Sequence, residues 1–264
     1  MDYQYILVDV KDRIATVTIN RPEYSNAFAR ESYFEIADAM NTLGAREDVG
    51  AIVITGAGKH FSAGGDIKRF KMLVDTGAYL KAEDIEAVSA MPMSIRNCPK
   101  PVIAMINGVA TGAGLSCALA CDFRIVEPSS KMIMAFVNMG LCGDNESIYT
   151  LTRLLGPDKA ELMMMTGDAY KGEQCVKTGL ATVLAEDGKL AETTYALAAK
   201  LASKSSTAHA GQKRLIRKYF YGGMENFAKD EGIEMAAASR QPDFTEAVNA
   251  FIEKRMPAYN LPHK

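Results

Sequence analysis

Two clusters of small residues offer the clearest chemistry in this sequence. One runs from Ile106 to Ser116 (INGVATGAGLS), between an apolar strand-like run and an apolar helical pattern, and the other is Ser62–Asp66 (SAGGD). Small residues at the start of a helix let a ligand approach the backbone closely, and the free N–H groups there can donate to an anionic oxygen. Two such turns could direct two N–H donors at one carbonyl oxygen, which predicts an oxyanion hole.

Strand-like and helical patterns alternate through the first half of the chain. Helices are expected near residues 30–43, 85–98 and 115–121. The expected strands are Tyr5–Val10, Ile14–Ile19, Ala51–Thr55, Pro101–Ile106 and Phe123–Val126. Such alternation favours an α/β sheet with crossover helices. Beyond about residue 145 the patterns are mostly helical, with one short strand candidate at Ala181–Leu184, and a change of character near residue 200 predicts a helical appendage.

The composition is that of an ordinary globular chain. Apolar residues make up 48% of the 264 positions, charged residues 23%, and the net charge is −2, so no basic surface for nucleic acid is expected. No apolar run approaches the roughly 18 residues of a membrane span, and the N-terminus lacks a secretory signal pattern. The five cysteines are therefore expected as free thiols in the cytoplasm. The three histidines form no ligand-like pair, so no metal is expected.

Four segments, in order along nearly the whole chain, carry a family resemblance. They are VTINRPEYSNAF (17–28), HFSAGGDI (60–67), PKPVIAMINGVATGAGLSCALACDFRI (99–125) and AFIEKRMPAY (250–259). These segments resemble the crotonase, or enoyl-CoA hydratase/isomerase, superfamily. The resemblance implies a spiral core of ββα turns over residues 1–200 and a C-terminal helical region, 201–264, that packs on neighbouring subunits. A homotrimer or a hexamer is therefore expected.

The same resemblance implies an acyl-CoA thioester substrate and no covalently bound cofactor, because coenzyme A enters as part of the substrate. It assigns the oxyanion donors to the N–H groups of Gly65 and Ala113. The family usually has glycine at the second position, and alanine keeps the N–H. Contacts to coenzyme A are expected from Ala63, Asp66, Ile67, Phe251 and Lys254, the last two on a segment that crosses a subunit interface. Taken alone, Asp66 also fits a helix cap and Lys254 an exposed helix charge.

The family's hydratases use two glutamates, and their positions fall here on Phe136 and Leu162. Neither side chain can transfer a proton. Asp144 instead matches the position of the catalytic acid in the family's enoyl-CoA isomerases. Burial beside Phe136 and Met139 would raise the pKa of Asp144, which would suit a proton shuttle. The acyl pocket is expected around Phe136, Met139 and Leu162.

Glu146 leaves alternatives open, because it either shares the pocket with Asp144 or faces away from it. Both acids also fit a helix start at residues 144–147. The favoured function is double-bond isomerisation of an enoyl-CoA by one acid. The alternatives are hydration of a conjugated or cyclic dienoyl-CoA by Asp144 and Glu146, decarboxylation of an acyl-CoA, dehalogenation or hydrolysis, and a non-catalytic protein that binds CoA esters or RNA. Dehalogenation is disfavoured because the chain has no Trp and its 85–98 helix has no His.

Overall fold

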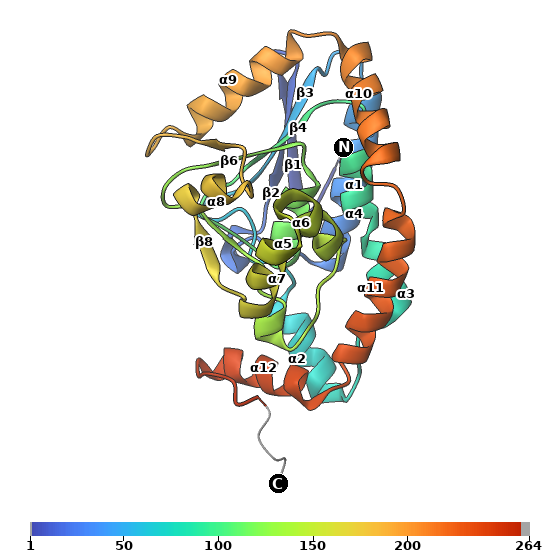
Figure 1. Cartoon of the computed structure of the whole chain (residues 1–264), viewed down its shortest axis with the longest axis vertical. Coiled ribbons are helices and arrows are strands. Elements are labelled where there is room, and N and C mark those ends of the chain that lie inside the picture. The colour runs from blue at the N-terminus through green and yellow to red at the C-terminus, as the bar shows by residue number, and fades with distance from the viewer. Residues whose placement is uncertain (1, 260–264) are drawn as a thin grey trace.

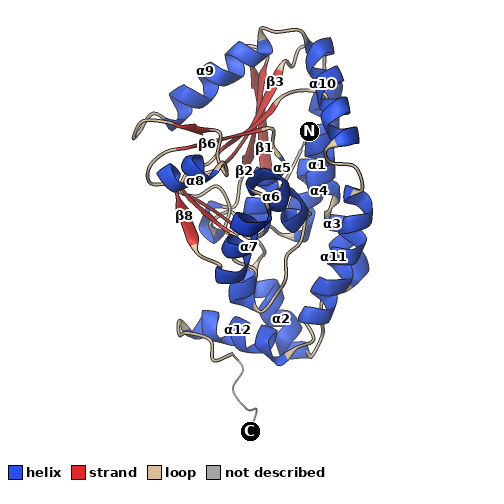
Figure 2. Ribbon diagram, viewed as in Figure 1, coloured by secondary structure: helices blue, strands red, loops and turns tan. Residues whose placement is uncertain are grey.

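The larger of two sheets has six strands in the order β1-β2-β3-β4-β6-β9. The computed structural model describes residues 2–259, and Figures 1 and 2 show its elements. The strands are β1 (Ile6–Lys11), β2 (Ile14–Ile19), β3 (Ala51–Gly56), β4 (Val102–Met105), β6 (Phe123–Val126) and β9 (Val183–Leu184). β1 and β2 are antiparallel, and the later pairings are parallel. Every strand that the sequence predicted is present.

Helices cover both faces of this sheet, so its central strands are buried. All six residues of β3 are buried. Ile52 and Ile54 belong to the larger core, together with the apolar face of α1 (Arg30–Ala45). Ala51 and Val53 face the opposite way, in a smaller core beneath α9 (Leu190–Ala202). The alternation follows the period of two of a strand, and the uninterrupted apolar run is typical of a parallel sheet covered on both faces.

A second sheet, of order β5-β7-β8, was missed by the sequence patterns. Its strands are β5 (Val109–Thr111), β7 (Lys131–Ile133) and β8 (Ala169–Lys171). Each has three residues, too few for an alternating pattern to stand out. The chain passes from β4 to β5 through the Asn107-Gly108 turn, where Gly108 adopts φ +71°. This turn carries the chain from the large sheet into the region of the small residues.

The predicted helix over residues 85–98 is two helices that meet at Ser89. Its two parts are α3 (Ala82–Val88) and α4 (Ala90–Asn97). The other helices of the described chain, besides α1 and α9, are α2 (Ile67–Thr76), α5 (Ala113–Ala120), α6 (Ser147–Leu155), α7 (Pro157–Thr166), α8 (Gly172–Thr178), α10 (Ser206–Tyr219), α11 (Met224–Ala238) and α12 (Pro242–Glu253), with short 3-10 turns η1 (Pro22–Tyr24) and η2 (Val137–Met139). The mixed α/β fold with a helical C-terminal region is confirmed.

The C-terminal helices lie along one side and one end of the molecule. In Figure 1, α10 and α11 run down one edge and α12 lies across the end. α11 packs on α3, and α12 packs on α2. The contact with α3 is close at Gly232, where a Cβ would lie 2.9 Å from the Ala82 carbonyl oxygen. Within residues 2–259 no helix combines the length and apolar character needed to cross a membrane, and the five cysteines are free thiols.

Candidate active site

The two small-residue turns lie side by side because the segments that lead into them pair as parallel strands. Ser62 is bridged to Ala110. The Ser62 N–H donates to the Val109 carbonyl at 3.0 Å, and the Ser62 carbonyl accepts the Thr111 N–H at 3.1 Å. This register brings the turn at residues 63–65 against the turn at residues 111–113.

Glycine is needed on both sides of this contact. Gly64 has φ +86°, and Gly112 has φ +53° and ψ −128°, conformations that a residue with a Cβ rarely adopts. A Cβ on residue 114 would lie only 2.6 Å from the Ser62 Cβ. Gly114 therefore lets helix α5 begin directly against the neighbouring turn.

Gly65 and Ala113 each present an N–H that donates to no other residue of the described chain. Ala113 is the first residue of α5, where N–H groups lack an intrahelical acceptor and the helix dipole is positive. Both residues line one cavity. The structure thus brings the two predicted donors to one cavity, an arrangement able to stabilise a carbonyl oxygen as it gains negative charge.

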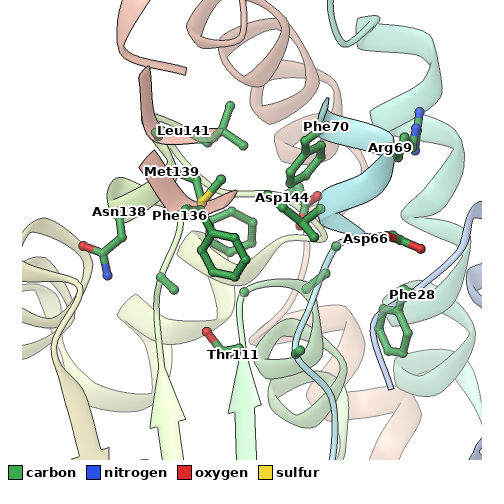
Figure 3. Close-up of a pocket in the computed structure, with 18 of the residues that line it drawn as sticks. Phe28, Asp66, Arg69, Phe70, Thr111, Phe136, Asn138, Met139, Leu141 and Asp144 are labelled. Carbon is green, nitrogen blue, oxygen red and sulfur yellow. The ribbon is translucent and has the colours of Figure 1, made fainter. Parts of the chain in front are cut away.

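The cavity has a volume of about 420 Å³ and a mainly apolar wall. Figure 3 shows several of the side chains around it, among them Phe28, Phe70, Phe136 and Met139. Further apolar side chains on its wall are Leu80, Ile85, Val88 and Met235. Such a wall suits a hydrocarbon chain, because apolar surface is stabilised when both partners leave water.

Asp144 lies on the wall of the same cavity and is 8% exposed (Figure 3). Its Oδ1 accepts a hydrogen bond from the Asn145 amide at 2.7 Å, and its backbone carbonyl accepts one from the Ser116 hydroxyl at 3.2 Å. Burial raises the pKa of Asp144 from 3.8 to about 6, although Asn145 and Arg69 oppose the rise. A carboxyl group with such a pKa can both accept and return a proton near neutral pH.

A strained turn presents Asp144 to the cavity. Asn145 and Glu146 both have left-handed backbones, with φ 54° and 52°. This conformation costs about 1–2 kcal/mol for a residue with a side chain such as glutamate. It persists only where neighbouring groups hold it. Here the Glu146 N–H donates to Oε2 of Glu231, on α11, at 2.7 Å.

Glu146 itself lies outside the cavity, so it does not share the pocket with Asp144. Its side chain is fully buried, is not among the residues that line the cavity, and makes no hydrogen bond through either carboxyl oxygen within the described chain. Burial raises the pKa of Glu146 to about 8, and the Asp144 and Glu225 carboxyls act in the same direction. It occupies the N-cap position of α6 without capping it through its side chain. The left-handed backbone at residues 145–146 is the reason the two acids diverge.

Asp66 lines the cavity but is engaged in holding the fold. Its side chain caps α2 by accepting the Lys68 N–H at 3.0 Å, and it pairs with the Arg21 guanidinium at 3.0 Å. The helix-cap interpretation of Asp66 is therefore confirmed. Among the carboxyl groups that line the cavity, Asp144 is the one without such a cation.

The pattern of one protein family, described as enoyl-CoA hydratase/isomerase, matches residues 9–261. The chain belongs to the enoyl-CoA hydratase/isomerase family. The trans-2-decenoyl-[acyl-carrier-protein] isomerase of Streptococcus mutans is 31% identical over 98% of this chain and 99% of its own length. The 1,2-epoxyphenylacetyl-CoA isomerase of Escherichia coli is 30% identical over 97% of this chain and 98% of its own length.

The fold comparison agrees with the family. A crystal structure of an enoyl-CoA hydratase from Mycobacterium avium subsp. paratuberculosis has a TM-score of 0.88 to this chain, with 26% identity, and covers 98% of this chain and 100% of its own. The relatives are named as isomerases and as hydratases. This member of the enoyl-CoA hydratase/isomerase family is therefore an enzyme of the isomerase or lyase class.

Most of the residues carried over from the family line the cavity, and two do not. Ala63, Ile67, Phe136, Met139 and Phe251 are on its wall. Leu162 is not, because on α7 the buried positions are Ala160 and Met163, and Leu162 points outward with 59% of its surface exposed. Lys254 is exposed at the left-handed C-cap of α12, while its neighbour Arg255 lines the cavity.

Several polar residues near the site were not predicted from the sequence, among them Tyr33, Arg69 and Glu231. Tyr33 and Arg69 line the cavity. Tyr33 packs edge-on against Phe28, at 5.0 Å between ring centroids. It lies on the buried face of α1, so its spacing indicates only a core residue. Glu231 comes from a helix distant in sequence, and no local pattern could have linked it to Asp144.

Proposed function

We propose that this enzyme moves a double bond in an enoyl thioester by means of a single carboxyl group, that of Asp144. The observation that carries the proposal is that Asp144 shares a cavity with the two unpaired N–H donors of Gly65 and Ala113. The other carboxyl group on the cavity wall, Asp66, is held by Arg21.

In this mechanism the thioester oxygen sits between the two backbone N–H groups. Asp144 removes a proton from the carbon between the thioester and the double bond, and the charge moves onto the oxygen as an enolate. The protonated Asp144 then returns the proton further along the chain, so the double bond shifts toward the thioester. Each N–H donor contributes about 10²- to 10³-fold in rate by stabilising that oxygen.

The apolar surroundings of Asp144 support isomerisation over hydration. Phe136 occupies the position at which the family's hydratases carry a glutamate, and Glu146 lies outside the cavity. Addition of water needs a group that positions and deprotonates the water, and the wall offers no second uncommitted carboxyl group among residues 2–259. The Streptococcus mutans relative is named a trans-2-decenoyl-[acyl-carrier-protein] isomerase, and a decenoyl chain also suits the apolar wall.

The test is product analysis in heavy water. A 3-enoyl-CoA and the matching 2-enoyl-CoA are incubated with the enzyme and followed by mass spectrometry and NMR. Migration of the double bond, with deuterium incorporated and no water added, is the expected result. Asp144→Asn should abolish it, and the exposed Glu161→Gln, which makes the same acid-to-amide change outside the cavity, should not. A hydrated product, or an active Asp144→Asn enzyme, would overturn the proposal.

We also propose that the thioester carrier is coenzyme A and that the enzyme is cytoplasmic. We further propose that it assembles as a homo-oligomer, with residues 201–264 as the assembling region. Ala63, Ile67 and Phe251 on the cavity wall are the candidate contacts for the carrier. α10 exposes Leu215, Ile216 and Tyr219, and such a group of apolar side chains is typical of a surface covered by a partner. Light scattering of the purified enzyme measures the oligomeric state.

A further inference from the structure

The turn that carries Asp144 is in contact with helix α11 of the C-terminal region. Asn145 and Glu146 are consecutive residues with left-handed backbones, and neither is glycine. Helix α6 begins directly after them, at Ser147. A small rotation of this turn toward an ordinary backbone would move the Asp144 carboxyl relative to the two N–H donors. The position of Asp144 therefore depends on whatever prevents that rotation.

Glu231 is the group in contact with the turn. It is 4% exposed, and its Oε2 accepts the Glu146 N–H at 2.7 Å. Its carboxyl group thus lies at the N-terminal end of α6, where N–H groups lack intrahelical acceptors. Burial, together with the Asp144 and Glu146 carboxyls, raises the pKa of Glu231 well above its usual range. The Ser116 hydroxyl also donates a hydrogen bond to the backbone carbonyl of Asp144, at 3.2 Å.

We infer that Glu231 is a positioning residue, which fixes the 145–146 turn so that the Asp144 carboxyl faces the thioester. Glu231 does not line the cavity, but Met235, one helical turn later on α11, does. The same helix therefore supplies part of the acyl wall and the support of the catalytic acid. This inference rests on the proposed role of Asp144.

Several other buried polar atoms lie around this contact. Oε1 of Glu231, both carboxyl oxygens of Glu146 and the Ser147 hydroxyl have no hydrogen-bond partner within residues 2–259. Buried polar groups without partners are unfavourable, so these groups lower the stability of the folded state.

The test compares Glu231→Gln with Glu231→Met in the full-length enzyme. Glutamine keeps an oxygen that can accept the Glu146 N–H, and methionine has a similar length without an acceptor. We expect Glu231→Met to lower kcat for double-bond migration about 10- to 100-fold, because it leaves the buried Glu146 N–H without an acceptor and releases the turn. KM, and the dissociation constant of a saturated acyl-CoA, should stay within twofold, because the two N–H donors are untouched. Glu231→Gln should retain kcat within about threefold.

Glu234→Gln, on the exposed face of the same helix, is the matched control and should behave as the wild type. If Glu231→Met does not fold, Glu231→Asp takes its place, since it keeps the carboxyl group but withdraws it by one methylene and should also lower kcat. The inference is overturned if kcat of every folded variant that lacks the contact stays within twofold of wild type, or if binding of the saturated acyl-CoA falls as much as kcat. An active Asp144→Asn enzyme would instead overturn the proposed function, whatever the Glu231 variants do.

Discussion

Replacing Asp144 by asparagine should make the enzyme inactive and, at neutral pH, more stable. Burial raises the pKa of Asp144 from 3.8 to about 6, so the folded protein binds this proton more tightly than the unfolded chain does. The ionised carboxylate therefore destabilises the folded state. A difference between 3.8 and about 6 corresponds to about 3 kcal/mol, with the favourable contribution of Asn145 already included.

The dependence on pH follows from the sign of this difference. Below pH 3.8 the group is protonated in both states and costs nothing. The penalty grows as pH rises from 3.8 to 6, and it is complete above the folded-state pKa of about 6. Asparagine resembles the protonated acid at every pH. The Asp144→Asn variant should thus gain about 3 kcal/mol in free energy of unfolding at pH 8 and nearly nothing at pH 4.

The measurement is urea unfolding of wild type and Asp144→Asn at pH 4, 6 and 8, at one protein concentration, because oligomers change apparent stability with concentration. Glu161→Gln, an exposed acid, serves as control and should show no pH-dependent difference. kcat of Asp144→Asn should fall by at least about 10²- to 10⁴-fold. Equal stability of the two proteins at pH 8, or a gain that is the same at pH 4 and pH 8, would refute the view that burial raises the pKa of Asp144.

Three further predictions concern the rest of the site. The kcat/KM of the wild type should fall about tenfold per pH unit below the Asp144 pKa of about 6, because the base must be ionised to take the proton; a flat profile from pH 5 to 8 would contradict this. Ala113→Pro removes one N–H donor at the first position of α5, where proline is tolerated. It should lower kcat about 10²- to 10³-fold and leave the circular dichroism spectrum unchanged. An unchanged kcat would show that this N–H does not stabilise the thioester oxygen. Gly114→Ala places a Cβ 2.6 Å from the Ser62 Cβ and should destabilise the fold by about 1–3 kcal/mol in thermal melts. Gly211→Ala on α10, where the added Cβ would meet only the Arg214 side chain at 3.9 Å, should be neutral or stabilising.

The two small-residue turns and the acid that share the cavity could be predicted from the sequence because their signals are local. Small residues between a strand and a helix mark the backbone of residues 62–66 and 111–114, and Asp144 stands at a family position. The main strands were predictable for the same reason, since apolar runs such as Ala51–Thr55 reflect burial on both faces.

The orientation of side chains could not be predicted, because it depends on contacts distant in sequence. Glu146 follows Asp144 by two residues, yet the left-handed backbone turns it away from the cavity. Leu162 matches a family position, but its helix buries Ala160 and Met163 instead. The strands β5, β7 and β8 are too short to carry a pattern of their own, although their pairing is what aligns the two turns.

Helices α11 and α3 pack closely at Gly232 and form a part of the cavity wall that is separate from the two small-residue turns. The Gly65 and Ala113 N–H groups belong to the two small-residue turns, whereas Leu80, Ile85 and Met235 reach the same cavity from the α3–α11 pair or from the residues beside it. A substitution on that pair can therefore change the size of the cavity without touching the turns that carry the two N–H groups.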